Sequence, residues 1–252
     1  MSNTGKTKIV ILAAGHGKRM QSELPKVLLQ VKGKSMVSML LKNVQDSKVD
    51  ERPVIIVGQK KEQVMAELGD KYDYAIQDEQ LGTGHAVMCA KDYLKNAEQV
   101  IVLYGDQPFT SAKTIRELTH IHSKSSKNIT MATVRVLDFL DWRACFANFS
   151  RVIRGQNGKI IKTVENKDAT EEEKKITEVN PCYFCFDADW LWENLEKVKN
   201  NNTQKEYYLT DLIKIATEEK IEIESIEIDP HEALGANSKE ELEVLERFAP
   251  NI

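Results

Sequence analysis

A glycine-rich segment near the N-terminus carries residues suited to binding phosphate. It reads Leu12-Ala-Ala-Gly15-His-Gly17-Lys-Arg19-Met20, and Leu24-Pro25-Lys26 follows shortly after it. Glycines directly after a strand let backbone N–H groups approach phosphate oxygens without interference from a Cβ atom. Arg19 and Lys26 add two cations for charge-assisted hydrogen bonds, and Pro25 stiffens the backbone before the lysine. The segment predicts an anion-binding turn that is neither a P-loop nor a complete dinucleotide fingerprint.

An aspartate at the end of an apolar run is a candidate metal ligand. The run from Gln99 to Tyr104 is followed directly by Gly105 and Asp106. Mg²⁺ prefers oxygen ligands and usually shares them with substrate phosphates, so a carboxylate at a strand end suits it. The alternative is that Asp106 caps the helix that follows. Gln107-Pro108 slightly favours the metal interpretation, because the proline begins a turn ahead of that helix.

Strand-like and helix-like patterns alternate through the first half of the chain. Lys8 to Ala13 is a continuous apolar run that predicts a central strand buried on both faces. We expect further strands over 53–57, 74–77 and 99–104, and helices over 35–47, 60–68, 83–94 and 111–123. This alternation predicts an α/β protein with a mostly parallel sheet. Ligands of such sheets bind at the carboxyl ends of the strands, which selects the loops after Ala13 and Tyr104.

The second half of the chain is less regular. Gln156-Asn157-Gly158 predicts the turn of a hairpin over 152–161. We expect a charged turn or short helix over 167–175, strands over 178–186 and 221–228, and helices over 187–199 and 210–219. Ser238 followed by Glu241 is a capping-box pattern, which predicts a final helix from 238 to about 248.

Composition argues against several classes of partner. The 252 residues carry a formal net charge of −4 with dispersed Lys and Arg, so we expect no binding to nucleic acid. The longest apolar run, Ile9 to Ala14, is too short to span a bilayer, and the N-terminus lacks the apolar stretch of a secretory signal. We therefore expect a cytoplasmic protein that does not associate with membranes.

Two of the four cysteines form a CxxC string, Cys182-Tyr-Phe-Cys185. A zinc site would need a second pair of ligands, and a redox motif would normally open a helix. The surrounding residues have the composition of a strand instead. We expect reduced thiols packed in or near the core.

Five strings of residues, taken in order, resemble a known family. They are LAAGxGxRM, LPKVL, QLGTGHA from Gln80 to Ala86, YGD, and EYYLTD from Glu206 to Asp211. Together they resemble the uridylyltransferase domain of bacterial N-acetylglucosamine-1-phosphate uridylyltransferase, over nearly the whole chain. The resemblance implies a Rossmann-like nucleotidyltransferase fold: an α/β protein with a mostly parallel mixed sheet flanked by helices and a smaller β-rich sugar-binding insertion. One domain over 1–252 would divide into a nucleotide-binding half to about 125, a sugar-binding half over about 126–237, and a C-terminal helix over 238–252.

The resemblance also implies roles for individual residues. Arg19 and Lys26 would be catalytic, Asp106 and Asn237 would hold Mg²⁺, and Gln77, Gly82 and Thr83 would read the uracil edge. The full set implied to bind the nucleotide is Leu12, Ala13, Ala14, Gly15, Lys26, Gln77, Gly82, Thr83, Tyr104, Gly105 and Asp106. The sugar would be contacted by Glu165, Asn180, Tyr208 and Thr210.

The implied reaction is Mg²⁺-dependent transfer of UMP from UTP to N-acetylglucosamine 1-phosphate, giving UDP-N-acetylglucosamine, a cell-wall precursor, and pyrophosphate. A sugar phosphate is largely dianionic at pH 7, because its second pKa is about 6, so it can attack without a protein base. Catalysis then consists of alignment and charge neutralisation. The expected partners are UTP and the sugar 1-phosphate alone.

Departures from the family pattern lie on the sugar side and keep alternatives open. This chain has Asn148-Phe-Ser150-Arg151 where the family usually has GxGR, and Asn180-Pro181-Cys182 where it usually has Asn-Thr-Gly. The sugar could therefore be glucose 1-phosphate or another hexosamine phosphate. A cytidylyltransferase and an inactive nucleotide-sugar-binding protein are further alternatives. The hexapeptide repeats of the family's trimeric acetyltransferase domain are missing, so we expect no acetyl transfer and a monomer or weak homo-oligomer.

Overall fold

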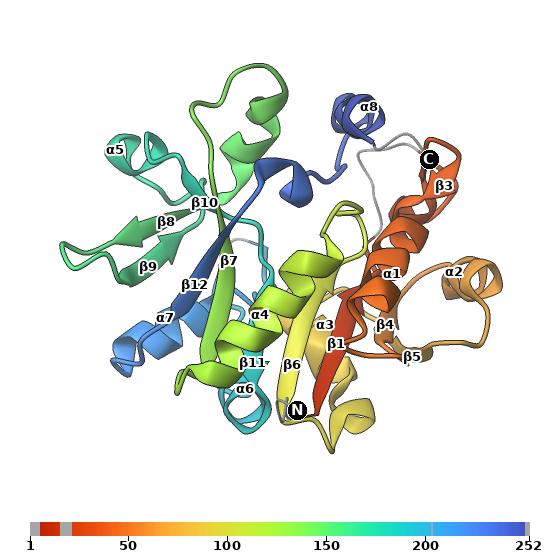
Figure 1. Cartoon of the computed structure of the whole chain (residues 1–252), viewed down its shortest axis with the longest axis horizontal. Coiled ribbons are helices and arrows are strands. Elements are labelled where there is room, and N and C mark those ends of the chain that lie inside the picture. The colour runs from red at the N-terminus through yellow and green to blue at the C-terminus, as the bar shows by residue number, and fades with distance from the viewer. Residues whose placement is uncertain (1–5, 16–21, 203, 250–252) are drawn as a thin grey trace.

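The computed structural model describes residues 6–15, 22–202 and 204–249. In this part of the chain, ten strands form one mixed sheet in the order β5-β4-β1-β6-β11-β7-β10-β8-β9, and β12 pairs with β7 (Figure 1). Its strands are β1 Thr7–Leu12, β4 Val54–Val57, β5 Asp73–Ile76, β6 Gln99–Tyr104, β7 Ile129–Arg135, β8 Ser150–Arg154, β9 Ile160–Val164, β10 Glu178–Asn180, β11 Phe184–Asp187 and β12 Glu224–Ile228. Strands β2 Gln30–Val31 and β3 Lys34–Ser35 form a separate hairpin. The helices are α1 Met36–Ser47, α2 Lys61–Leu68, α3 Thr83–Cys89, α4 Ala112–Lys124, α5 Glu171–Lys174, α6 Ala188–Leu195, α7 Asp211–Glu218 and α8 Lys239–Phe248.

The central strand β1 is buried on both faces, as its unbroken apolar run predicts. It pairs in parallel with β4 on one side and β6 on the other. Ile9 and Ile11 belong to the core beneath α1, α4 and α8, whereas Val10 and Leu12 belong to the core beneath α3, α6 and α7. Figure 1 shows α1 and α4 crossing the near face of the sheet. The α/β class and the helix-flanked mixed sheet expected from the sequence are confirmed.

The prediction of one continuous strand over 178–186 is wrong. The segment forms two strands, β10 and β11, with a break between them. Both pieces run antiparallel to β7, with Val179 opposite Val134 and Phe184 opposite Met131. Between them Pro181 offers no N–H for the ladder, and Cys182 has a left-handed φ of 67°. Beyond the break, β11 pairs with β6 while β10 pairs with β8. The sheet therefore forks near the carboxyl end of β6.

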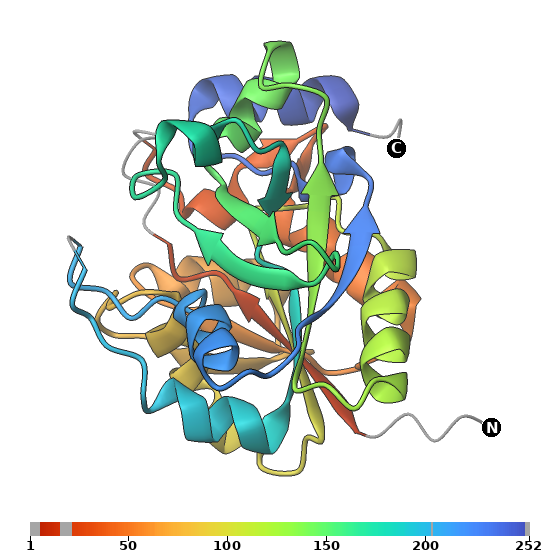
Figure 2. The ribbon, with the colours of Figure 1, turned by 90° about the vertical axis from the view of Figure 1, so that its left-hand side faces the viewer.

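The β8–β9 hairpin forms as predicted, with Gly158 at a φ of 75° in its turn. Figure 2 faces this end of the molecule and shows the hairpin with α7 packed below it.

The boundaries of other elements differ from those predicted from the sequence. The helix expected over 83–94 ends at Cys89 and continues as a 3₁₀ turn, Lys91–Leu94, and β12 begins only at Glu224. Strand β7 was not anticipated, although it joins the two halves of the sheet. In the described residues no helix is long and apolar enough to cross a bilayer.

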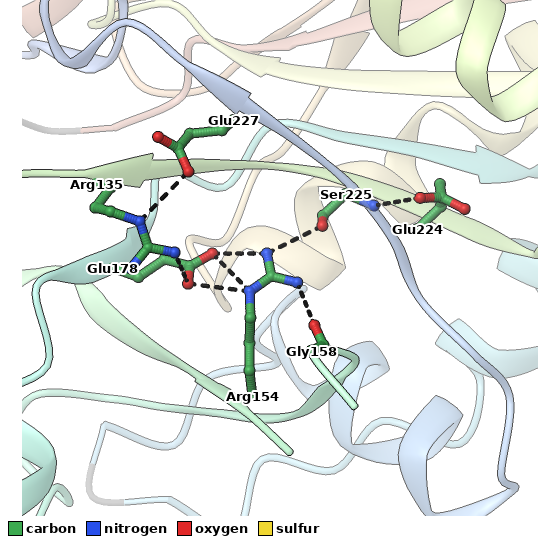
Figure 3. A network of polar contacts seen from close by, with 7 residues as sticks. All are labelled: Arg135, Arg154, Gly158, Glu178, Glu224, Ser225 and Glu227. Atoms are coloured by element: carbon green, nitrogen blue, oxygen red, sulfur yellow. Dashed lines mark hydrogen bonds and ion pairs between the residues drawn. The ribbon is translucent and has the colours of Figure 1, made fainter. Parts of the chain in front are cut away.

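A buried carboxylate ties four strands of the β-rich end together (Figure 3). Glu178 on β10 is 3% exposed and accepts hydrogen bonds from Arg135 of β7 at 2.8 Å and from Arg154 of β8 at 2.7 Å. Arg154 also donates to Ser225 Oγ on β12 at 3.1 Å. Burial alone would raise the pKa of Glu178, but the hydrogen bonds from Arg154 and the charges of both arginines outweigh it, so the pKa lies below its ordinary value. The ionised form is therefore part of the folded state.

We predict that Glu178→Ala lowers the free energy of unfolding by about 2 kcal/mol, because it removes the buried carboxylate that accepts hydrogen bonds from Arg154 and from the half-exposed Arg135. Because the folded pKa of Glu178 is depressed, its contribution is present above the ordinary pKa of 4.5 and is lost as the pH falls through the folded value. Urea unfolding at pH 7 and at a series of values below 4.5 measures both effects. The matched control is Glu227→Ala, an exposed partner of Arg135, which should change stability by less than about 0.5 kcal/mol. Equal losses in the two variants would contradict the prediction.

Candidate active site

Two adjoining clefts open at the carboxyl ends of β1 and β6. The α3 cleft is lined by Leu12, Ala14, Gly15, Lys26, Val27, Gln77, Gln80, Gly82, Thr83, Ala86, Tyr104, Asp106, Glu206 and Asn237. The β10 cleft is lined by Tyr104, Asp106, Gln107, Cys145, Asn148, Phe149, Ser150, Glu165, Asn180, Pro181, Cys182, Gly235, Asn237 and Glu241. Tyr104, Asp106 and Asn237 belong to both clefts. A molecule with two parts could therefore occupy both clefts and be contacted at its joint by these three residues.

A lysine, a carboxylate and an amide meet where the clefts join. Lys26 begins a 3₁₀ turn, Lys26–Leu28, directly after Pro25, and its Nζ donates to Asp106 Oδ2 and to Asn237 Oδ1, the latter at 2.9 Å. The side chains of Lys26 and Asp106 are only 13% and 15% exposed, so their attraction is weakly screened by solvent. Three segments far apart in the sequence thus place one cation and two oxygen ligands at a single point.

The loop before α8 is fixed onto the end of β6. Ala236 donates its N–H to the carbonyl of Asp106 at 3.3 Å, and a Cβ atom on Gly235 would lie 3.0 Å from that carbonyl oxygen. The predicted cap of α8 is present, since Ser238 Oγ accepts from the N–H of Glu241 at 3.3 Å. The Glu241 carboxylate, however, accepts from the N–H of Asn237 at 2.6 Å rather than from that of Ser238. The helix cap therefore also holds the amide residue of the site in place.

The oxygens of Asp106 and Asn237 suit a magnesium ion that is shared with phosphate. Both already converge on one positive charge, the Lys26 ammonium. No group of three or more His, Cys, Asp or Glu side chains in the described residues could hold a metal by itself. Mg²⁺ commonly takes one or two protein oxygens and completes its octahedron with substrate phosphates and water. The two residues fit that pattern.

Most residues expected to bind a nucleotide line the α3 cleft, and several are braced by backbone contacts. Gln77 Nε2 donates to the Gly82 carbonyl at 3.0 Å and lies 3.1 Å from His85 Nδ1. Thr83 Oγ1 accepts from the N–H of Leu209 at 2.9 Å. Gly82 has a φ of 103°, and a Cβ atom there would come within 2.6 Å of the Tyr207 carbonyl oxygen. The segments 81–84 and 206–209 are therefore in close contact, and together they form one wall of the α3 cleft.

Two of the expected residues are placed differently, and a third cannot be compared. Ala13 does not line the α3 cleft, because its side chain faces the opposite core and its N–H donates to the Ile56 carbonyl at 2.9 Å. Gly105 does not line it either, and its N–H donates to Leu12 at 2.9 Å. Arg19 lies outside the described residues, as do Gly17 and the rest of 16–21. Val27, Ala86 and Glu206 also line the α3 cleft; they lie in the motifs LPKVL, QLGTGHA and EYYLTD but are not among the residues expected to bind the nucleotide.

Two of the residues expected to contact the sugar line the β10 cleft, Glu165 and Asn180. Thr210 lies behind Glu165 and donates to its Oε1 at 3.2 Å, whereas Tyr208 donates to Gln204 and does not line the cleft. Burial raises the pKa of Glu165, and the Thr210 hydrogen bond opposes the rise. Gln107 also lines this cleft; its sequence context indicated only a turn.

A buried arginine shapes the far wall of the β10 cleft. Arg151 is 2% exposed and lies over the Phe139 ring at 4.6 Å. It donates to the carbonyls of Ala147, at 2.9 Å, and Phe149. The segment between these carbonyls carries Asn148, so Arg151 fixes the backbone of the wall instead of facing a ligand. Burial lowers the pKa of its guanidinium.

The cysteines fit the expectation of unreactive thiols. All four are free, Cys185 is fully buried in β11, and burial raises the pKa of both Cys182 and Cys185. The CxxC string is divided by the sheet, because Cys182 lies at the break after β10 while Cys185 lies within β11.

Comparison with known proteins identifies the class to which this site belongs. Residues 9–206 match the model of the MobA-like NTP transferase domain, and the chain belongs to this family of nucleotidyltransferases. It is 40% identical over 235 residues to the bifunctional protein GlmU of Clostridium novyi, covering 92% of this chain and 50% of that protein. It is 42% identical over 242 residues to the GlmU of Fervidobacterium nodosum, covering 96% and 50%. The chain spans about half the length of these curated relatives. The family resemblance drawn from the motifs is confirmed.

A solved structure shows the same fold. It is that of a Bacillus anthracis protein assigned as a glucose-1-phosphate thymidylyltransferase, crystallised with sucrose. The two chains superpose with a TM-score of 0.77 over 98% of this chain and 96% of the other, at 20% sequence identity.

We predict that Gly82→Ala weakens nucleotide binding at least tenfold and lowers the melting temperature, because the new Cβ would clash with the Tyr207 backbone in a conformation that only glycine adopts readily. Gly33→Ala is the matched control. Gly33 also has a positive φ, 77°, but nothing lies within 4 Å of its Cβ position. Nucleotide affinity by calorimetry and melting by circular dichroism distinguish the two variants. Similar behaviour of both would show that the 81–84 and 206–209 contact does not form the cleft wall.

Proposed function

We propose that the chain transfers UMP from UTP to N-acetylglucosamine 1-phosphate, giving UDP-N-acetylglucosamine and pyrophosphate, with Mg²⁺ as cofactor. The observation that supports this most strongly is the meeting of Lys26, Asp106 and Asn237 at the junction of the two clefts. In a nucleotidyl transfer the reacting phosphates lie between the nucleoside and the sugar. A cation and two oxygen ligands at that junction are what such a reaction needs.

In the proposed reaction, an oxygen of the sugar phosphate forms a bond to the α-phosphorus of UTP. The bond from that phosphorus to the oxygen bridging the α- and β-phosphates breaks, and pyrophosphate leaves with that oxygen. No protein base is required, because the attacking group is already ionised. The Lys26 ammonium donates hydrogen bonds to phosphate oxygens and offsets the charge that develops on them. Bound at Asp106 and Asn237, Mg²⁺ would supply further positive charge. Arg19 is proposed as the second catalytic cation.

The two clefts support a division of labour between the halves of the chain. We assign the nucleotide to the α3 cleft, where Gln77, Gly82 and Thr83 are proposed to read the uracil edge. We assign the sugar to the β10 cleft, where Glu165 and Asn180 are proposed contacts and Thr210 supports Glu165. Tyr208 is proposed only as a residue that borders the sugar.

A different sugar 1-phosphate is the second candidate substrate. Pro181 and Ser150 both line the β10 cleft. Pro181 has no N–H to donate, and Ser150 adds a side chain to the wall, so the cleft offers less room and fewer donors than a glycine-lined one would. Glucose 1-phosphate is the smaller candidate that these two residues favour.

A panel of substrates tests the proposal. Purified protein with Mg²⁺ is incubated with each of UTP, CTP, dTTP and ATP together with N-acetylglucosamine 1-phosphate, glucosamine 1-phosphate or glucose 1-phosphate, and pyrophosphate release is followed. We expect the highest kcat/KM for UTP with N-acetylglucosamine 1-phosphate, and loss of turnover with EDTA. Turnover with CTP alone would indicate a cytidylyltransferase, and no turnover with any pair would indicate a nucleotide-sugar-binding protein.

We predict that Lys26→Met lowers kcat by a factor on the order of 100 or more, because the variant loses the cation at the transferring phosphate. Lys113→Met is the matched control, since Lys113 is an exposed residue of α4 that lines neither cleft. Steady-state kinetics at saturating substrates measure the effect. A rise in KM at an unchanged kcat would contradict a role for Lys26 in the transition state.

A further inference from the structure

Two buried amide side chains in the β10 cleft each keep one polar atom without a partner. Gln107 and Asn180 are 7% and 1% exposed, and both line the cleft. Gln107 Oε1 and Asn180 Nδ2 have no hydrogen-bond partner in the described residues. A buried acceptor or donor without a partner lowers the stability of a folded protein. A cleft that retains one of each is suited to a ligand that satisfies both.

The opposite atom of each amide is held by the backbone, which fixes the direction of the side chain. Gln107 Nε2 donates to the carbonyls of Pro181, at 3.3 Å, and Ala233, at 3.5 Å. Turning this amide over would bring its oxygen against two carbonyl oxygens. Asn180 Oδ1 accepts from the N–H of Cys182 at 2.7 Å, and turning that amide would bring two donors together. The unpartnered atoms are therefore one acceptor, from Gln107, and one donor, from Asn180.

The break between β10 and β11 creates this pair. At this break the Cys182 N–H donates back to Asn180 Oδ1, and the Pro181 carbonyl accepts from Gln107. Because Gln107 donates to the residue next to Asn180, the two amides are neighbours. They stand beside Asp106, which lies one residue before Gln107 and belongs to the proposed site of phosphate chemistry.

The geometry points to Gln107 as a specificity-determining residue that recognises an acylamino substituent on the sugar phosphate. Gln107 Oε1 accepts from the N–H of that group, and Asn180 Nδ2 donates to its carbonyl oxygen. A hydroxyl group could also donate to Gln107 Oε1 and accept from Asn180 Nδ2, but it has no apolar surface. The same cleft presents Cys145, Phe149 and Pro181, which an acyl methyl group would cover and a hydroxyl group would not. The assignment rests on the proposed nucleotidyl transfer and names the feature of the sugar that the cleft reads.

Replacing the amide by an apolar side chain of similar shape tests the assignment. With saturating UTP, the ratio of kcat/KM for N-acetylglucosamine 1-phosphate to that for glucose 1-phosphate is measured in the wild type and in Gln107→Met. We expect the ratio to fall by a factor on the order of 10 to 100, with the KM for UTP little changed. The melting temperature should change little, because the variant removes a buried oxygen without a partner together with the two long hydrogen bonds from Nε2. Gln45→Met, an exposed glutamine of α1, should leave the ratio as it is.

A second variant and a binding measurement keep the test independent of folding and turnover. Asn180→Asp retains the oxygen that accepts from Cys182 but replaces the donor by an acceptor, so the same ratio should fall. By calorimetry, the preference of the wild type for UDP-N-acetylglucosamine over UDP-glucose should shrink in both variants. An unchanged ratio in an active, folded Gln107→Met protein would overturn the inference while leaving the proposed function intact. A wild type that prefers glucose 1-phosphate would also overturn it, and a wild type without turnover on any pair would instead reject the proposed function.

Discussion

The constraint on which the rest of the structure depends is the interruption of one strand at residues 181–183. An unbroken strand over 178–187 would have continued along β7 and closed the sheet beside β6. Pro181 cannot donate to the ladder and Cys182 takes a left-handed φ, so the chain leaves the sheet for three residues. The strands on either side then acquire different partners, β6 for the second piece and β8 for the first. The fork that results is where the β10 cleft opens.

A second feature follows from where the fork lies. The end of β6 has no neighbour from β11 beyond Val102, so Tyr104 and Asp106 project at the open edge of the sheet. Lys26 and Asn237 reach this edge from two other segments, and all three groups are shielded from solvent. In the absence of substrate, the Lys26 ammonium neutralises the charge of the Asp106 carboxylate. When phosphates bind, the same ammonium can move to them, so the charge balance of the free protein already contains the cation that the proposed reaction uses.

The sequence could predict the parts of the site that depend on local pattern. An apolar run buried on both faces identifies β1 and β6, the segment after β1 identifies Lys26, and the end of β6 identifies Asp106. Asn237 was expected only from the family resemblance, just before the helix that the capping pattern predicts. Pro181 is a signal against one continuous strand, but the apolar residues on both sides of it outweighed that signal in the prediction over 178–186. The separate partners of β10 and β11 depend on tertiary pairing and could not be predicted. Nor could the sequence predict that Ala13 faces away from the cleft, since its N–H is taken by Ile56. The role proposed for Gln107 depends on which amide atom lacks a partner, and that is visible only once the folded neighbours are known.

The short strand β10 links rigidity to recognition. Glu178 and Asn180 are two residues apart, so the pleat directs them to the same face of the strand. Glu178 is held there by Arg135 and Arg154, and the same clamp reaches β12 through Ser225. The position of the Asn180 amide is therefore set by the ion pairs of the buried Glu178 carboxylate, two residues or roughly 7 Å along the strand from it. A cleft built at a break in a sheet would otherwise be soft, and this clamp gives it the fixed geometry that discrimination between similar sugars requires.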